Sequence, residues 1–173
     1  RKMISVLSRL ESMLPSRTRR DDETDRMQQF STPFRLSYIA SLFAKPHSGL
    51  TILEPSAGTG VLAVMAALGN ATLVCNELSE RRSALLRTLF GRVFTEDASH
   101  IHDVLPADVS PDCVLMNPPF GRLRGESSKS RKATMVHILS SARRLASGGR
   151  LIAITGERWH AADAHYGDQV AQL

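Results

Sequence analysis

Asn117, Pro118, Pro119 and Phe120 carry the clearest sign of chemistry in this 173-residue sequence. The apolar run CVLM before them favours a buried strand, and two consecutive prolines end a strand and prevent a helix from starting on them. The Asn117 side chain offers a carbonyl oxygen, and proline geometry can fix a backbone carbonyl beside it. Two such acceptors can hold both hydrogens of a planar amine, while the Phe120 ring offers a stacking face. The pattern predicts orientation and electrostatic activation of an amine, without a strong general base.

A turn with two glycines, Gly58 and Gly60, predicts a ligand-binding loop between a strand and a helix. Glycines there allow positive φ and a close approach of the backbone to a ligand. No GK[ST] follows, which excludes a P-loop, and Ala63 in place of a third glycine makes only a loose match to a dinucleotide fingerprint. Glu77 ends the next apolar run, about 20 residues on, where an acid accepts hydrogen bonds from ribose hydroxyls.

Two further acids favour a particular nucleoside ligand. Glu54 places a carboxylate where a dinucleotide would bring its phosphates, which suits a cationic or ammonium-bearing ligand instead. Asp97, followed by Ala98, could accept a hydrogen bond from an adenine amino group. Adenine, ribose and a positively charged amino acid moiety together describe S-adenosylmethionine, which is the cofactor that we expect.

Short apolar runs alternate with helical patterns from Leu50 onward, which predicts an α/β fold with a mostly parallel sheet and helices on both faces. Ligands of such sheets bind at the carboxyl ends of the strands. Glu54, Glu77, Asp97 and Asn117 follow four of the runs and are expected to meet there. The predicted strands are residues 50–55, 71–77, 92–97, 112–117 and 150–156, and the predicted helices are residues 60–68, 79–91 (closed by Gly91) and 134–149.

The first part of the chain predicts two helices, residues 2–14 and 31–44, separated by a charged linker. The second helix has Ser31 or Thr32 as its cap and Pro33 at its first position. We assign residues 1–27 to an N-terminal helix and linker and residues 28–173 to the main domain, and expect a piece of a longer protein because the chain begins with Arg1. The face of the second helix expected to pack against the domain is Leu36, Ile39, Ala40 and Phe43.

The bulk composition is that of a globular protein. Lys and Arg outnumber Asp and Glu by 22 to 17, and the net charge of +5 permits a polyanionic partner such as nucleic acid. Cys75 and Cys113 lie in apolar runs and are expected to be reduced core thiols of a cytoplasmic protein, not a disulfide. No Cys and His cluster predicts a metal site, and no apolar run approaches the roughly 20 residues of a membrane span.

Four motifs in order, ILEPSAGTG, NELS, EDAS and NPPFG, resemble those of amino methyltransferases of the Rossmann-like class. The match is closest to DNA adenine-N6 methyltransferases of the γ type, in which the cofactor motifs precede the catalytic motif. The segment QQFSTPFRLSYIAS, residues 28–41, resembles the part of those enzymes that closes over the methionine end of the cofactor. QQFSTP with LEPSAGTG is, more narrowly, similar to methylase domains attached to strawberry-notch-like helicases, which implies a helicase region in the same parent chain.

The resemblance implies a class I S-adenosylmethionine-dependent methyltransferase fold and methyl transfer to adenine N6 in DNA. A base within a duplex would have to be flipped out, at a cost of a few kcal/mol. The resemblance assigns the ribose of the cofactor to Glu77, its adenine to Asp97, and its methionine end to Glu54, Gly58 and the segment 30–32. The expected catalytic residues are Asn117, Pro118, Pro119 and Phe120. The expected cofactor-binding residues are Phe30, Ser31, Thr32, Glu54, Pro55, Ser56, Ala57, Gly58, Thr59, Gly60, Glu77, Leu78, Asp97, Ala98 and Asn117.

A basic stretch rich in Gly and Ser follows Phe120, and we expect a loop that borders the pocket and contacts phosphates of nucleic acid, DNA above all. Its expected nucleic-acid-binding residues are Arg122, Arg124, Lys129, Arg131 and Lys132. The sequence also departs from a complete DNA methyltransferase. The residues after the fifth strand are too few for the final β-hairpin of this fold, and no segment is long enough for a target-recognition domain.

Other functions stay open at this point. The NPPF chemistry also suits guanine N2 in ribosomal RNA and the side-chain amide of a protein glutamine, because both present planar amines. The resemblance implies that glutamine methyltransferases more often have Tyr where Phe120 stands. A function of another class is a non-catalytic methyltransferase-fold module that binds nucleic acid or scaffolds a larger helicase-type protein.

Overall fold

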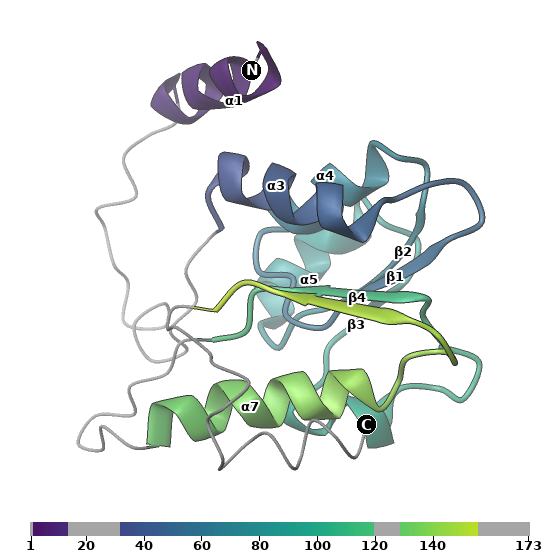
Figure 1. The fold of residues 1–173 in the computed structure, drawn as a ribbon. Coiled ribbons are helices and arrows are strands. Elements are labelled where there is room, and N and C mark those ends of the chain that lie inside the picture. The colour runs from purple at the N-terminus through teal and green to yellow at the C-terminus, as the bar shows by residue number, and fades with distance from the viewer. Residues whose placement is uncertain (1, 14–31, 120–128, 156–173) are drawn as a thin grey trace, which may run out of the picture.

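The protein's structure, a computed structural model, describes residues 2–13, 32–119 and 129–155. Its centre is a five-stranded, all-parallel sheet with helices on both faces (Figure 1), as the sequence predicts. No helix within these ranges is long and apolar enough to cross a bilayer. The elements are α1 (Lys2–Met13), α3 (Phe34–Ala44), β1 (Thr51–Glu54), α4 (Val61–Ala67), β2 (Thr72–Asn76), α5 (Glu80–Arg87), β3 (Val93–Phe94), a 3₁₀ helix (Ala98–His100), α6 (Ile101–Val104), β4 (Cys113–Met116), α7 (Lys129–Ala142) and β5 (Arg150–Ala153).

The strand order is β3-β2-β1-β4-β5. The chain runs outward from β1 through β2 to β3, then crosses back to place β4 on the other side of β1. The direction of winding therefore reverses between β1 and β4, which pair in the register Leu53↔Val114. In open sheets of this kind the ligand crevice lies at such a switch point, outside the carboxyl ends of the strands.

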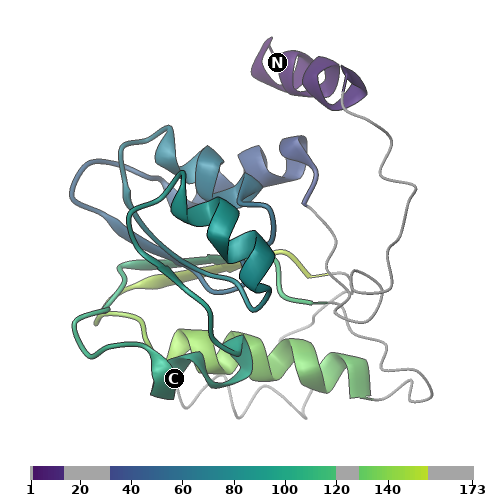
Figure 2. The same cartoon turned by 180° about the vertical axis from the view of Figure 1, so that it is seen from behind.

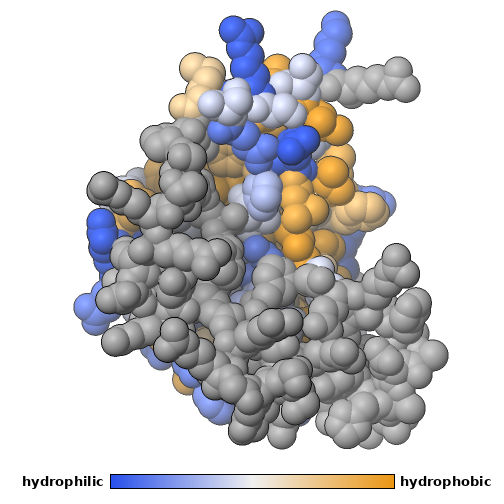
Figure 3. All heavy atoms as spheres, turned by 90° about the vertical axis from the view of Figure 1, so that its left-hand side faces the viewer, coloured by the Kyte–Doolittle hydropathy of each residue, from blue (hydrophilic) through white to orange (hydrophobic). Residues whose placement is uncertain are grey.

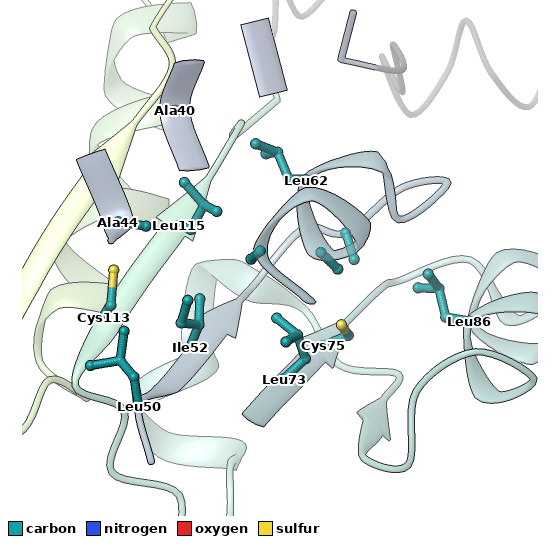
Figure 4. Packing of buried hydrophobic residues seen from close by; sticks show 13 residues of the cluster. Ala40, Ala44, Leu50, Ile52, Leu62, Leu73, Cys75, Leu86, Cys113 and Leu115 are labelled. Atoms are coloured by element: carbon teal, nitrogen blue, oxygen red, sulfur yellow. The ribbon is translucent and has the colours of Figure 1, made fainter. Parts of the chain in front are cut away.

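Two apolar cores, one on each face, explain why the central strands are uninterrupted apolar runs. Ile52 and Leu115 point into the core beneath α3, α4 and α5, which Figure 4 shows from close by. Leu53 and Val114, their neighbours in sequence, belong to the core on the opposite face, against α6 and α7. Figure 2 shows the same two layers from behind. Both cysteines, Cys75 of β2 and Cys113 of β4, are buried and free in the first core, as predicted.

The prediction of which face of α3 is buried is wrong. Of the predicted face only Ala40 is buried, and Phe43 is 66% exposed. The face of α3 that is buried consists of small residues, which let the helix lie close to α4 and to the strands β4 and β5. Larger side chains on the buried face would keep α3 farther from them. Hydrophobic side chains reach the surface in the upper half of the view in Figure 3. The residues that α3 buries are Ser37, Ala40, Ser41 and Ala44.

The start of α3 also differs from the prediction. Pro33 has extended geometry (φ −58°, ψ 142°) and precedes the helix instead of opening it. Glu11 of α1 supplies the cap: its Oε1 accepts a hydrogen bond of 2.6 Å from the backbone N–H of Phe34, and its Oε2 accepts one of 3.1 Å from Arg35. A carboxylate suits this position because the first N–H groups of a helix lack partners and carry positive charge. One side chain thus caps α3 and attaches α1 to it.

Other element boundaries moved as well. The helix α5 ends at Arg87, so Gly91 does not close it; the N–H groups of residues 88–90 instead turn back to Leu85 and Leu86. The helix α7 begins at Lys129, five residues earlier than predicted, so the end of the basic stretch is helical rather than a loop; Lys, Arg and Ser there do not oppose a helix. The sequence did not predict the short helices after Asp97. The predicted linker lies outside the described residues.

Substitutions in α3 test which face packs. We expect Ala44→Leu to lower the free energy of unfolding by about 1–3 kcal/mol, because a larger side chain does not fit at a fully buried position. Phe43→Gln, at an exposed position, should change it by less than about 0.5 kcal/mol. Urea denaturation of both variants measures the difference, and the opposite ranking would favour the face predicted from hydrophobicity.

Candidate active site

Asn76, the last residue of β2, joins the ends of three strands. Its side-chain Nδ2 donates hydrogen bonds of 2.9 Å to the carbonyl of Pro55, after β1, and to the carbonyl of Glu96, after β3. Its Oδ1 accepts a 2.9 Å hydrogen bond from the N–H of Glu96. The side chain is buried, and its backbone carbonyl also accepts the N–H of Ala57. The sequence analysis missed this residue; its signal was a polar amide closing an apolar run.

Glu77 ties the glycine turn to the start of α5. Its Oε2 accepts a 2.7 Å hydrogen bond from the N–H of Gly58, and its Oε1 accepts one of 3.0 Å from the N–H of Ser79. The side chain is buried. Each carboxylate oxygen has more than one lone pair, so an oxygen that already accepts one hydrogen bond can accept a second from a ribose hydroxyl. Glu77 therefore fits the ribose role expected of it.

The two glycines of the turn serve different purposes. Gly60 has a φ of 81°, and a Cβ built on it would lie 2.7 Å from Leu86 Cδ2, so it permits close packing of the turn against α5. Gly58 has a φ of 57°, but no described atom lies within 4 Å of where its Cβ would be. Among the described residues, therefore, none fills the space beside Gly58, whose N–H is bound by the Glu77 carboxylate, and a ligand can approach the backbone there.

Glu54 is a buried acid at the end of β1. It accepts a hydrogen bond from the backbone of Ala63 in the first turn of α4, a helix whose preceding residue, Gly60, has no side chain to cap it. Burial raises the pKa of Glu54 well above its ordinary value; the Ala63 hydrogen bond lowers it, and the nearby Glu77 raises it further. Its Oε2 has no hydrogen-bond partner among the described residues. A buried, unpaired carboxylate oxygen fits a ligand that brings a donor or positive charge.

Asp97 caps the 3₁₀ helix that follows β3. Its Oδ1 accepts a 2.9 Å hydrogen bond from the N–H of Ser99. Partial loss of solvent around the carboxyl is the largest influence and raises its pKa, but hydrogen bonds from Ser99 and the nearby His137 and His100 together lower the pKa below its ordinary value. Asp97 is exposed, so its ionised carboxylate can accept a hydrogen bond from an amino group that reaches it.

Asn117 lies directly after β4, beside the switch point. Its Nδ2 donates a 2.9 Å hydrogen bond to the hydroxyl oxygen of Thr32. Its Oδ1 is buried and has no partner in the described part of the chain. The hydroxyl of Thr134 on α7 donates a 3.1 Å hydrogen bond to the carbonyl of Pro119, and Pro118 is buried. The two prolines are thus held between the sheet and α7, with one amide oxygen left to receive a donor.

The structure brings most of the predicted site residues to one edge of the sheet. In the glycine turn, Pro55 and Ala57 are buried and Thr59 is exposed, while Ser56 is half-buried; after β2 and β3, Leu78 is exposed and Ala98 buried. Lys129, Arg131 and Lys132 lie in the first turns of α7, five, three and two residues before Thr134, and only their backbone is described. The predicted site residues outside the described ranges are Phe30, Ser31, Phe120, Arg122 and Arg124.

Neither a protein-family model nor a curated protein sequence matches the chain, but solved structures of methyltransferases do. A protein from Pyrococcus horikoshii, provisionally described as an RNA methyltransferase, has a TM-score of 0.53 at 25% identity, over 77% of this chain and 69% of that one. The methyltransferase subunit of a type I restriction-modification system from Streptococcus thermophilus has a TM-score of 0.56 at 20% identity, over 77% of this chain and 36% of that one. A TehB-like S-adenosylmethionine-dependent methyltransferase from Corynebacterium glutamicum has a TM-score of 0.50 at 17% identity, over 78% of this chain and 68% of that one.

These similarities confirm the predicted fold class: the chain has the Rossmann-like α/β fold of S-adenosylmethionine-dependent methyltransferases. They also agree with S-adenosylmethionine as the expected cofactor. The chain spans about a third of the restriction-modification subunit. The acceptor of the methyl group does not follow from the fold, because one fold hosts many substrates.

Removing the Asn76 side chain should loosen the whole edge. We expect Asn76→Ala to lower the free energy of unfolding by about 1–3 kcal/mol, because buried backbone groups of Pro55 and Glu96 lose their partners. Thr72→Val, at an exposed position of the same strand, is the control and should cost less than about 0.5 kcal/mol. Equal urea midpoints for the two variants would contradict the role given to Asn76.

The raised pKa of Glu54 predicts a pH dependence of stability. The unfolded chain loses the Glu54 proton near the ordinary value of 4.5, whereas the folded protein holds it to higher pH, so this group makes stability fall as pH rises from 4.5 through its raised pKa. We expect Glu54→Gln to remove that fall and to be more stable than the parent at neutral pH. Urea denaturation across the pH range measures it, with the exposed Glu80→Gln as matched control. If the free energy of unfolding of Glu54→Gln changed with pH as steeply as that of the parent protein, a raised pKa of Glu54 would be contradicted.

Proposed function

We propose that this chain is a methyltransferase that uses S-adenosylmethionine to methylate an exocyclic amine, with adenine N6 in DNA as its substrate. One observation carries the proposal: the Oδ1 of Asn117 is buried and, among the described residues, unpaired, at the carboxyl end of β4. It lies beside the switch point between β1 and β4; Glu54 ends β1, and Glu77 follows β2, the next strand of the sheet. The proposal thus assigns the catalytic hydrogen-bond acceptor and the cofactor crevice to one edge of the sheet.

The residues of this edge fit the cofactor in chemistry and in space. Glu77 would accept the ribose hydroxyls, Asp97 the adenine amino group, and Glu54 with the glycine turn the ammonium-bearing methionine end. The open space beside Gly58 and the unpaired Oε2 of Glu54 within the described structure support this placement. The bound cofactor supplies an electrophilic methyl group next to a positively charged sulfur.

The chain's own contribution to the reaction is to prepare the amine. A conjugated amine is a weak nucleophile because its lone pair is delocalised into the ring. Accepting hydrogen bonds from both amine hydrogens, at Asn117 Oδ1 and at the backbone carbonyl of Pro118, orients the nitrogen and increases its electron density. In the proposal Phe120 supplies the stacking face for the base, which must be extrahelical to reach this edge.

DNA is supported by the order of the motifs and by the positive charge that follows the catalytic segment. Arg122, Arg124, Lys129, Arg131 and Lys132 would neutralise phosphates, which positions a nucleic acid without reading its sequence. A helicase region in the same parent chain, and a methyltransferase unit of residues 28–173, belong to the same proposal. RNA is the second candidate, favoured by the 25% identity to the Pyrococcus horikoshii protein described as an RNA methyltransferase.

Methyl transfer to separate acceptors tests the proposal. The protein is incubated with methyl-labelled S-adenosylmethionine and with single-stranded DNA, duplex DNA, RNA or protein. We expect label in N6-methyladenine of DNA. In Asn117→Ala the rate should fall at least about 100-fold, because one catalytic hydrogen bond is removed, and cofactor binding measured by calorimetry should fall far less than the rate. Asn70→Gly, at an exposed turn position of positive φ, is the control that keeps full activity.

Each other outcome identifies another function. Label in RNA alone would overturn DNA as the substrate and favour the second candidate. Label in protein alone would favour glutamine methylation. No label in any acceptor, with no measurable cofactor binding, would favour a non-catalytic module that keeps the fold without the chemistry.

A further inference from the structure

We infer that Thr32 is a positioning residue for Asn117, which it holds with the amide oxygen presented to the amine. The inference rests on the proposed function and deepens it. The sequence resemblance assigns Thr32 to the methionine end of the cofactor, whereas the structure places its hydroxyl oxygen 2.9 Å from Nδ2 of Asn117. The two residues are 85 positions apart in the chain, and Thr32 is buried.

The orientation of the Asn117 amide decides whether the site can work. The oxygen and the NH2 group of an amide have nearly the same size, so a half-turn of the side chain exchanges a hydrogen-bond acceptor for two donors. A donor facing the hydrogens of an amine would repel it. With Nδ2 engaged by Thr32, Oδ1 is the atom left buried and, within the described ranges, without a partner. In the structure the Thr32 hydroxyl acts as the acceptor for Nδ2, which holds the amide with its oxygen available before the substrate arrives.

Thr32 is itself held firmly. Pro33 follows it with its φ fixed at −58°, and the next residue, Phe34, donates its backbone N–H to Glu11 of α1 over 2.6 Å. The small buried face of α3 then fixes that helix against α4 and the sheet. Thr32 thus contacts Asn117 from just before the start of α3, a helix that packs on the core and is capped by Glu11 of α1. Through this cap, α1 helps to fix the position of Thr32 although it does not itself contact Asn117 in the hydrogen bonds described above.

The isosteric substitution Thr32→Val removes the acceptor and keeps the shape. We expect kcat to fall about 10- to 100-fold at saturating cofactor, because the amide loses the hydrogen bond that anchors its Nδ2 and is no longer held in place. The Kd of S-adenosylmethionine and the KM of the acceptor should change less than about threefold. Thr32→Ser, which keeps the hydroxyl, should stay within about threefold of the parent in kcat. Thr51→Val, the same exchange at the opposite end of β1, is the matched control and should match the parent.

A spectroscopic readout tests the contact without any reaction. The side-chain amide signals of Asn117, identified by their absence in Asn117→Ala, report the hydrogen bond of Nδ2 in ¹H–¹⁵N spectra of the protein. We expect one proton of the pair to exchange slowly with solvent in the parent and in Thr32→Ser, and to exchange faster with a changed shift in Thr32→Val. The Thr51→Val spectrum should keep the parent signals.

The outcomes separate this inference from the proposed function. Unchanged amide signals and kcat in Thr32→Val would overturn the inference. A weaker cofactor Kd with kcat intact at saturation would also overturn it, and would return Thr32 to the cofactor alone. If no variant and no parent protein transfers a methyl group, the proposed function fails, while the amide signals still decide whether Thr32 holds Asn117.

Discussion

The pairing of buried polar groups at the carboxyl edge of the sheet is the constraint on which the site depends. Each strand ends in a turn whose backbone groups leave the sheet ladder, and buried groups of this kind require partners. Asn76 and Glu77, adjacent residues at the end of β2, provide them: Asn76 binds the chain after β1 and after β3, and Glu77 binds the glycine turn and the start of α5. The same bonds that satisfy the backbone fix the shape of the crevice.

This arrangement places two acidic side chains, Glu54 and Glu77, close together and away from water. Glu77 spreads its charge over two backbone N–H donors, whereas Glu54 has the N–H of Ala63 and, in the described chain, an unpaired second oxygen. Proximity to Glu77 adds to the effect of burial in raising the pKa of Glu54. A buried acid without full compensation is costly in the free protein, and a cationic ligand would lower that cost on binding. Such an edge is better suited to the positively charged ligand of the proposed function than to one with phosphates.

Sequence patterns predicted the sheet well because both of its faces are covered. Strands buried on two sides become continuous apolar runs, and the polar residues that end them, Glu54, Glu77 and Asn117, mark the ligand edge. The same reasoning failed for α3, because hydrophobicity measures the gain from burial but not the close approach that Ala40 and Ala44 permit.

Other features depend on contacts that a single sequence does not reveal. The cap of α3 comes from Glu11, 23 residues away, and the partner of Asn117 is Thr32, 85 residues away. The end of α5 is set by packing too: Phe90 packs against the core before Gly91 is reached, so the chain turns inward ahead of the expected stop. Local signals located all five strands, although β3 is shorter than predicted (Val93–Phe94 against residues 92–97), and they were incomplete wherever tertiary contacts set a helix end or a side-chain orientation.

The choice of an amide at position 117 follows from the charges around it. A carboxylate there would be a third acid beside Glu54 and Glu77, and mutual repulsion in a buried site would favour its protonated form. A protonated carboxyl group donates a hydrogen bond, and a donor is the wrong partner for the hydrogens of an amine. An asparagine provides an acceptor that does not titrate, but rotation of its side chain can exchange the positions of the amide oxygen and nitrogen. If Asn117 has the catalytic role proposed for it, its amide needs a neighbour that fixes its direction, and the hydrogen bond from its Nδ2 to Thr32 supplies one.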